Sequence, residues 1–262
     1  MKDTVNQAFT LLEPLLREIG EELKEIFFST NFEVKYKEKS ELVTTADKLS
    51  EDHLIKTIKK NFPDHNILSE EVGKAHNSDS DFLWVIDPVD GTTNFAYHNP
   101  FFAIAVSLFY KNEVVLGMIY NPVLNEMYWA KKGEGAYFNG KKLQVNNNKD
   151  LETLRLTYCH GNTDKSINDA IKLYSYFKKQ GSIRQLGSAG MELALVARGI
   201  IDAFVVPGAL RWDVGAGILL IREAGGKVVD FTGEEWHFDS KDMLADNGKF
   251  YQQLLPIIND VL

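Results

Sequence analysis

Apolar residues recur at steps of three and four between Val5 and Ile26, which is the period of an amphipathic helix. A second helix is predicted from about Thr45, because Thr44 and Asp47 have the spacing of a capping box. The first part of the chain is therefore predicted to be helical.

The pattern changes to β-rich runs between residues 82 and 143. The runs FLWVI, FFAIAVSLFY, VVLGMIY, EMYWA and GAYF are separated by turn signals such as KNE and NPVLN, which predicts an antiparallel meander. From about residue 150, strand-like runs alternate with helices expected at 166–180, at 188–199, at 212–224 and after Asn247. This alternation indicates layered α/β structure.

The composition is that of an ordinary globular protein, with 44% hydrophobic and 25% charged residues. No apolar run approaches the roughly 20 residues of a membrane span, and the N-terminus lacks an apolar signal core, so we expect neither export nor a membrane partner. The one cysteine, Cys159, cannot form an internal disulfide, which fits a cytoplasmic protein. The net charge of −8 argues against a nucleic-acid partner.

The segment DPVDGTTN at 87–94 directly follows the FLWVI strand and is the most informative motif. Pro88 forces an immediate turn, so the carboxylates of Asp87 and Asp90 can converge on one point. Such a pair repels unless a divalent cation relieves the repulsion, and oxygen ligands favour Mg²⁺, Mn²⁺ or Ca²⁺ over zinc.

The second half of this motif suits a phosphate. Gly91 allows close backbone approach, and Thr92 or Thr93 is suited to a helix N-terminus, whose free N–H groups would point at a phosphate. The alternative is a plain proline turn in which an aspartate caps the next helix.

Acidic residues at three further sites favour the metal and phosphate site over the plain turn. Glu70 and Glu71 follow a short apolar run, Asp213 lies near the start of a predicted helix, and Asp47 lies in the capping box. The simpler explanations are a solvated loop for the glutamates, a helix N-cap for Asp213 and a helix cap for Asp47.

Taken in order and spacing, these motifs cover nearly the whole chain. The sequence resembles the inositol monophosphatase family of Mg²⁺-dependent, lithium-sensitive phosphatases. The resemblance rests on LVTTAD at 42–47, ILSEE at 67–71, WVIDPVDGTTNF at 84–95, LGSAGMELALVARGIIDAF at 186–204, WDVGAG at 212–217 and EAGG at 223–226.

The resemblance implies a set of metal ligands. Glu70, Asp87 and the backbone carbonyl of Val89 would hold one Mg²⁺. Asp87 would bridge to a second ion, completed by Asp90 and Asp213. Two or three ions per site are expected, with Mn²⁺ as an alternative metal. Asp90 and Asp213 would also border the substrate.

The resemblance also implies catalytic and substrate-binding residues. The N–H groups of Gly91 and Thr92 would bind phosphate. The Thr92 hydroxyl, held by Asp47, would help to orient and deprotonate the attacking water, so that these two residues and Glu70 form the catalytic set. Ser188 and Ala189 match a segment that approaches the leaving group.

Substrate identity is less constrained, because inositol-selective members place a glutamate seven residues before the aspartate of the WD motif. Val206 occupies that position here, and Arg211 in the same loop could meet a second phosphate. We therefore predict relaxed selectivity for a small phosphate monoester. The alternatives are the 2′-phosphate of NADP, fructose 1,6-bisphosphate or another non-inositol ester.

The resemblance implies a layered αβαβα sandwich assembled as a homodimer. The polar NNNKD stretch at 146–150 is the expected junction. Residues 1–148 would form an α+β half with most metal ligands. Residues 149–262 would form an α/β half that contributes Asp213 and the substrate loop.

Three other functions fit the sequence less well. GAYFNGKK at 135–142 matches most of a P-loop, but Lys142 stands where Ser or Thr is needed and the flanks are β-like. A serine hydrolase would need a G-x-S-x-G motif, which is missing. A non-enzymatic binding role is disfavoured because every acidic residue of the motifs is present.

Overall fold

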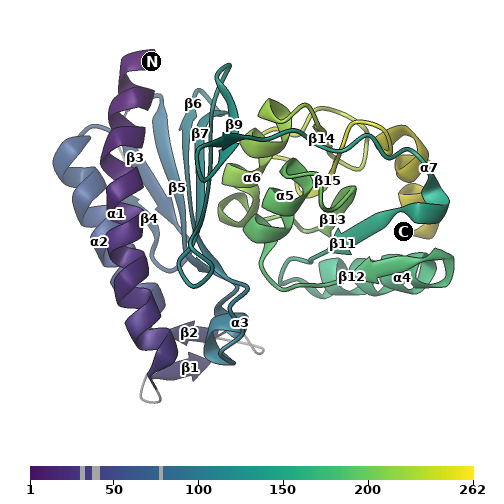
Figure 1. Ribbon diagram of the computed structural model, residues 1–262, viewed down its shortest axis with the longest axis horizontal. Helices are drawn as coiled ribbons and strands as arrows, with labels where there is room; N and C mark the ends of the chain where they lie inside the picture. The colour runs from purple at the N-terminus through teal and green to yellow at the C-terminus, as the bar shows by residue number, and fades with distance from the viewer. Residues whose placement is uncertain (30–32, 37–41, 77–78) are drawn as a thin grey trace.

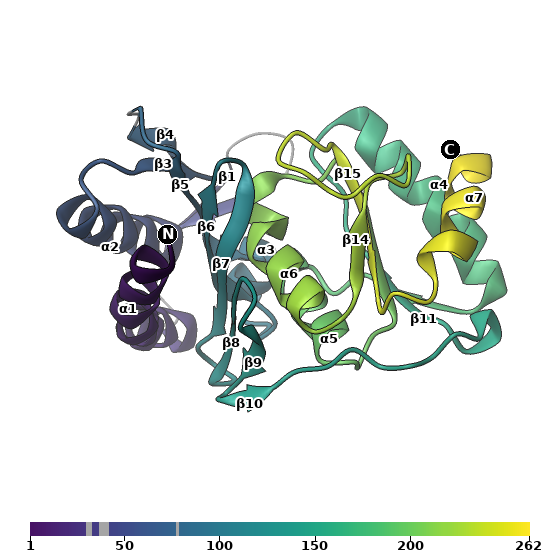
Figure 2. The same cartoon turned by 90° about the horizontal axis from the view of Figure 1, so that it is seen from above.

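The computed structural model describes residues 1–29, 33–36, 42–76 and 79–262, which form five alternating layers of helices and sheets (Figures 1 and 2). An outer helical layer covers an eight-stranded sheet, a central pair of helices separates this sheet from a five-stranded sheet, and a last pair covers the far face. The predicted αβαβα sandwich is confirmed. The layers contain α1 (Lys2–Phe28) and α2 (Thr45–Asn61), then α5 (Ala189–Ala197) and α6 (Arg211–Glu223), then α4 (Asp164–Gln180) and α7 (Tyr251–Val261).

The larger sheet has the strand order β10-β9-β8-β7-β6-β5-β3-β4. Strands β5 to β10 are antiparallel neighbours in sequence order, which confirms the predicted meander. The pair β3 and β4 was not predicted, and β3 runs parallel to β5. The bounds are β3 (Asn66–Ser69), β4 (Gly73–His76), β5 (Phe82–Asp90), β6 (Ala103–Tyr110), β7 (Glu113–Asn121), β8 (Glu126–Lys131), β9 (Gly135–Phe138) and β10 (Lys141–Lys142).

The GAYFNGKK segment forms a β-hairpin of β9 and β10. A P-loop instead connects a strand to a helix, so the P-loop alternative is excluded. A separate small hairpin pairs β1 (Val34–Tyr36) with β2 (Leu42–Thr44), and α3 (Thr92–Ala96) is a short helix directly after β5.

The smaller sheet has the order β12-β11-β13-β15-β14 and is mixed. The alternating pattern predicted most of its strands but not β15, which lies antiparallel between β13 and β14. The bounds are β11 (Arg155–Tyr158), β12 (Ser182–Arg184), β13 (Ala203–Pro207), β14 (Lys227–Val229) and β15 (Asp242–Asp246), with a 3₁₀ turn at Leu151–Thr153.

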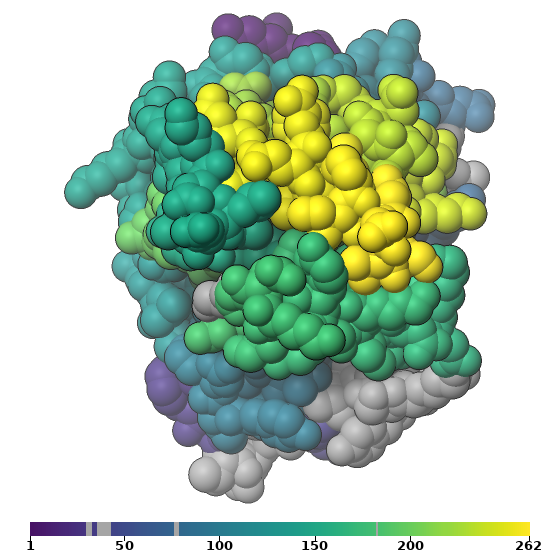
Figure 3. All heavy atoms as spheres, turned by 90° about the vertical axis from the view of Figure 1, so that its right-hand side faces the viewer, coloured from purple at the N-terminus to yellow at the C-terminus, as the bar shows by residue number. Residues whose placement is uncertain are grey.

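Both faces of the larger sheet are covered, which explains why its strands have continuous apolar runs. On one face α1 and α2 bury their apolar stripes, and on the other α5 and α6 pack against the same strands. The outer helices α4 and α7 lie side by side at the far end (Figure 3), where Lys172 Nζ donates to the carbonyl of Leu262. No helix in the described part of the chain has the length and apolarity to span a bilayer.

Small residues allow α6 to lie directly on the larger sheet. A Cβ at Gly117 of β7 would be 2.5 Å from the carbonyl oxygen of Ala216, and one at Gly217 would be 2.5 Å from Leu193 of α5. This close packing fixes α6 against the sheet and so positions Asp213, which lies in its first turn.

We predict that Gly117→Ala lowers the free energy of unfolding by about 1–3 kcal/mol, because the new methyl group meets backbone that cannot give way. Denaturant unfolding measures this change. Gly181→Ala is the matched control: its Cβ would meet open space at an extended φ of 171°, and it should change stability by less than about 0.5 kcal/mol. Equal stability of the two variants would contradict the close packing.

Candidate active site

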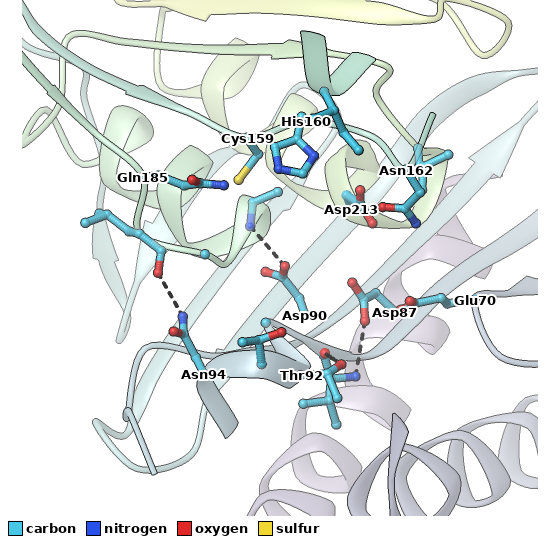
Figure 4. Close-up of a pocket in the computed structure, with 18 residues that line it drawn as sticks. Glu70, Asp87, Asp90, Thr92, Asn94, Cys159, His160, Asn162, Gln185 and Asp213 are labelled. Carbon is cyan, nitrogen blue, oxygen red and sulfur yellow. Dashed lines mark hydrogen bonds between the residues drawn. The ribbon is translucent and has the colours of Figure 1, made fainter. Parts of the chain in front are cut away.

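The predicted acids meet in one cavity of about 530 Å³ (Figure 4). It lies at the end of β5 and is closed by the first turn of α6 and by the loops that follow β11 and β12. Glu70, Asp87, Asp90 and Asp213 all line it, although they are far apart in the sequence. The side chains of Asp87 and Glu70 lie next to each other on one wall (Figure 4).

The two aspartates of the central motif project from an irregularity in the sheet. The pairing of β5 with β6 shifts register between Asp87 and Asp90, where Pro88 cannot donate to the ladder. The N–H of Val89 donates to Asp87 Oδ1 at 3.1 Å. Both aspartates are buried, so the bulge directs two carboxylates into the interior end of the cavity.

Asp90 is held by the start of α5. Its Oδ2 accepts from Ser188 Oγ at 2.6 Å and from the Gly190 N–H at 2.8 Å, and its Oδ1 accepts from the Ala189 N–H at 2.9 Å. Ala189 lines the cavity, whereas Ser188 lies behind Asp90 as the N-cap of α5. The resemblance implied that the segment of Ser188 and Ala189 approaches the leaving group, and that stays a prediction; the structure shows the Ser188 hydroxyl bonded to the Asp90 carboxylate.

Glu70 follows β3 in a tight turn that is fastened on both sides. Its N–H donates to the carbonyl of Ile86 in the parallel strand β5 at 3.1 Å. Glu51 of α2, which is buried and was not predicted, accepts from the Ser69 hydroxyl and from the Val72 N–H at 3.3 Å. The turn is therefore an ordered part of the site rather than a solvated loop.

The acids strongly affect one another. Burial, and then the charges of Glu70, Asp90 and Asp213, raise the pKa of Asp87 well above its ordinary value. Burial also raises the pKa of Asp90 to about 6, against the opposing hydrogen bonds from Ser188 and the α5 backbone. Neither Lys nor Arg lines this cavity within the described residues, so the protein itself supplies no permanent cation.

This cluster fits a divalent cation of the Mg²⁺ type. The donors are all oxygens, the neighbouring carboxylates repel, and a cation between them removes the cost of that repulsion. No group of three or more His, Cys, Asp or Glu side chains among the described residues already has an arrangement that could hold a metal ion. We therefore expect carboxylates to reorient when an ion binds.

Thr92 and Asp47 form a hydrogen-bonded pair beside the acids. Thr92 Oγ1 lies 3.1 Å from Asp47 Oδ1 and 3.0 Å from the carbonyl oxygen of Val89, both acceptors. Asp47 Oδ2 accepts from the N–H and the hydroxyl of Thr44, both at 2.7 Å, so the predicted capping box is present. Burial raises the pKa of Asp47 to about 6. Asp47 is thus a helix cap and a partner of Thr92 at once.

Gly91 precedes α3 with φ at +90°, a conformation that favours glycine. A Cβ there would also lie 2.9 Å from the carbonyl oxygen of Gly187. Gly91 and the first residues of α3 line the cavity, and the first N–H groups of a helix have no partner within it. Asp213 is the third residue of α6, whose N-cap is Leu210, so the simple prediction of an N-cap aspartate is wrong.

The opposite wall consists of residues that the sequence analysis did not predict to belong to the site. Cys159, His160 and Asn162 come from the loop after β11, and Gln185 comes from the loop after β12 (Figure 4). Both loops directly follow predicted strands, and that position was the available signal. Loops at strand ends are where ligand-contacting side chains are commonly found.

Two positions that were expected to set selectivity lie outside this cavity. Val206 is 1% exposed and belongs to the core between the two sheets. Its side chain does not line the cavity. Arg211 lines an adjoining cavity of about 510 Å³. Its Nε donates to the carbonyl of Phe238 at 2.7 Å, its Nη2 donates to Asp239 at 3.1 Å, and its guanidinium stacks on the Phe238 ring.

Glu192 of α5 supports the loop after β12 from behind. It is fully buried, and its Oε1 accepts from the N–H groups of Leu186 and Gly187 at 3.1 Å and from Cys159 Sγ at 3.3 Å. Burial raises the pKa of Glu192 to about 7. The loop that packs on Gly91 therefore depends on this carboxyl group.

A carboxyl group whose pKa is higher in the folded than in the unfolded state binds its proton more tightly when folded. Glu192 should therefore reduce stability as the pH rises from about 4.5 to 7. Glu192→Gln keeps an acceptor for the loop but cannot ionise. We predict that it is more stable than the natural protein at pH 8 by about 2 kcal/mol, with a smaller difference at pH 5.

Urea unfolding in excess chelator at pH 5 and pH 8 measures this difference. Glu25→Gln, on the exposed face of α1, is the matched control and should follow the natural protein at both values. Ionisation of Glu192 is expected to destabilise the natural protein between pH 5 and pH 8. This expectation would be contradicted if Glu192→Gln lost as much stability over this range as the natural protein.

Known proteins match nearly the whole of this chain. The sequence profile of the inositol monophosphatase family matches residues 5–262. The chain is 37% identical to the fructose-1,6-bisphosphatase/inositol-1-monophosphatase of Thermotoga maritima, over 85% of this chain and 84% of that protein. It is 36% identical to the Nus factor SuhB of Escherichia coli, over 88% of this chain and 87% of that protein.

Among solved structures, the extragenic suppressor protein SuhB from Bartonella henselae has a TM-score of 0.90 and 29% sequence identity, over 98% of this chain and all of that chain. The profile spans almost the entire sequence, and the relatives above 30% identity match over most of their own length. The chain therefore belongs to the inositol monophosphatase family and is a phosphoric monoester hydrolase.

Proposed function

We propose that this protein hydrolyses a small phosphate monoester in a Mg²⁺-dependent reaction at the acidic cavity. The observation that carries the proposal is the convergence of Glu70, Asp87, Asp90 and Asp213 on one cavity that Thr92 also lines. Family membership supports the same assignment. Assembly as a homodimer and a cytoplasmic location remain predictions.

The ligand set is the one that the resemblance to the family implies. Glu70, Asp87 and the Val89 carbonyl would hold one ion, and Asp87, Asp90 and Asp213 a second. When bound, the ions supply positive charge that offsets the phosphate dianion and the charge that develops on the attacking and leaving oxygens. The negative charge of the clustered acids is what would hold these positive ions in place.

The chain's own groups bind the phosphate and move one proton. The N–H groups of Gly91 and Thr92 would donate to phosphate oxygens. When Asp47 is ionised, the Thr92 hydroxyl donates to Asp47 Oδ1, and this leaves an oxygen lone pair of Thr92 as acceptor for a proton of the attacking water. The raised pKa of Asp47, about 6, makes this carboxylate a stronger base than an exposed aspartate.

A non-enzymatic binding role is the second candidate, because relatives such as that of Escherichia coli are named Nus factor SuhB. The acids argue for the enzyme: four carboxylates close together, two of them buried, destabilise the fold unless a bound ion offsets their charge. The relative from Thermotoga maritima is named for two substrates, so phosphate release from several esters is the direct test.

We predict that phosphate release requires Mg²⁺ and stops reversibly when a chelator is added. Asp87→Asn should lower kcat by at least about 10³-fold, because this carboxylate would serve both ions. Asp81→Asn, an exposed position just before β5, is the matched control and should keep normal activity. Full activity in excess chelator would contradict the mechanism.

We predict that Thr92→Ala lowers kcat by about 10²-fold with little change in KM, because the proton transfer occurs only in the transition state. Thr92→Ser keeps the hydroxyl and should recover most of the rate. Asp47→Asn, which keeps the cap but is not a base, should lower kcat as well. Normal kcat in Thr92→Ala would show that the water is activated by another group.

A further inference from the structure

Asn94 lies in α3, the short helix whose start would bind phosphate, but its side chain is bonded to other segments (Figure 4). Its Nδ2 donates to the carbonyl oxygen of Phe101 at 2.7 Å and to that of Leu186 at 2.8 Å. Its Oδ1 accepts from Asn99 Nδ2 at 2.9 Å. Because carbonyl oxygens only accept, these two bonds fix the orientation of the amide and use both of its hydrogens. Asn94 therefore has no donor left for a substrate.

The bond to Leu186 connects the two halves of the chain. Leu186 lies 92 residues beyond Asn94, in the loop after β12 that leads into α5. On its other side this loop is held by Glu192, which accepts from the N–H groups of Leu186 and Gly187, both at 3.1 Å. The loop is thus bonded to the first half of the chain by Asn94 and to α5 by Glu192.

The segment held in this way runs from the phosphate-binding turn to a predicted metal ligand. At one end, the carbonyl oxygen of Gly187 packs so closely on Gly91 that a Cβ there would lie 2.9 Å from it. At the other end, residues 188–190 donate three hydrogen bonds to Asp90. The distance from the phosphate-binding N–H groups to Asp90 therefore depends on how this segment lies against α3.

We propose that Asn94 is a positioning residue, which fixes the loop after β12 against α3 and so holds the phosphate-binding N–H groups in place relative to Asp90. This inference rests on the proposed phosphatase function and adds a residue to that site. Loss of the Asn94 amide releases the loop from Gly91. The same N–H groups bind the phosphate in the ground state and in the transition state, so their displacement weakens binding more than it slows the chemical step.

Asn146 offers a matched control. Its Nδ2 also donates to two backbone carbonyls, that of Gly199 at 3.0 Å and that of Ile201 at 3.4 Å, and its Oδ1 accepts from Asn247 Nδ2 at 2.8 Å. It joins separate segments as Asn94 does, but it does not line the cavity. Asn94→Ala and Asn146→Ala therefore remove similar hydrogen bonds, and only the first should affect phosphate.

Isothermal titration with inorganic phosphate in the presence of Mg²⁺ tests the proposal. We expect Asn94→Ala to raise the Kd of phosphate by about 10-fold, the effect of one or two neutral hydrogen bonds. The KM of a hydrolysed ester should rise by a similar factor, with kcat within about 3-fold of the natural value. Asn146→Ala should leave all three constants unchanged, even where it unfolds at a lower temperature. Asn94→Ser, whose shorter side chain cannot bond both carbonyls, repeats the test where Asn94→Ala does not fold.

Hydrogen–deuterium exchange reports on the loop itself, without substrate. The amides of Leu186 and Gly187 should exchange faster in Asn94→Ala than in the natural protein, and at the natural rate in Asn146→Ala. Unchanged exchange, an unchanged phosphate Kd in folded Asn94→Ala, or a fall in kcat at constant KM would overturn the proposal. If the natural protein neither binds phosphate with Mg²⁺ nor hydrolyses any ester, the proposed function itself fails.

Discussion

The burial of Asp87 among other carboxylates is the constraint on which the rest of the site depends. The side chain is 2% exposed, and both its burial and three neighbouring acids raise the cost of its charge. A fold gains no stability from such a cluster by itself. The surrounding structure must fix it rigidly, and a cation or proton must offset its charge, which couples the site to the ion it would bind.

Two adjacent layers of the sandwich, the larger sheet and the central pair of helices, together hold the acids. The irregular end of β5 presents two aspartates, the start of α5 supplies three donors to Asp90, and the first turn of α6 supplies Asp213. Close contact between Gly117 and Ala216 sets the distance of α6 from the sheet. The small residues in these helices therefore serve the site as well as the core.

Periodicity and local motifs allowed the meander and the alternating second half to be predicted, because they report short-range preferences. The order of the layers and the full set of four acids were implied by the resemblance to the family. The sequence did not reveal β15, since a short strand inserted between β13 and β14 is defined by pairing partners rather than by its own pattern. Glu51 and Glu192 were missed for a similar reason. Glu51 accepts from a turn 21 residues further along the chain, Glu192 accepts from the loop just before its own helix, and no local motif marks either contact.

The position of Val206 shows where a residue-by-residue comparison becomes insufficient. The resemblance to the family identified the loss of a glutamate acceptor but not what the substrate would meet instead, because a substrate contacts a surface assembled from several loops. The histidine that faces the cavity comes from the loop after β11, on a different strand of the same sheet. In the proposed reaction, ions and backbone would bind the phosphate at the end of β5, and the loops after β11 and β12 would border the leaving group.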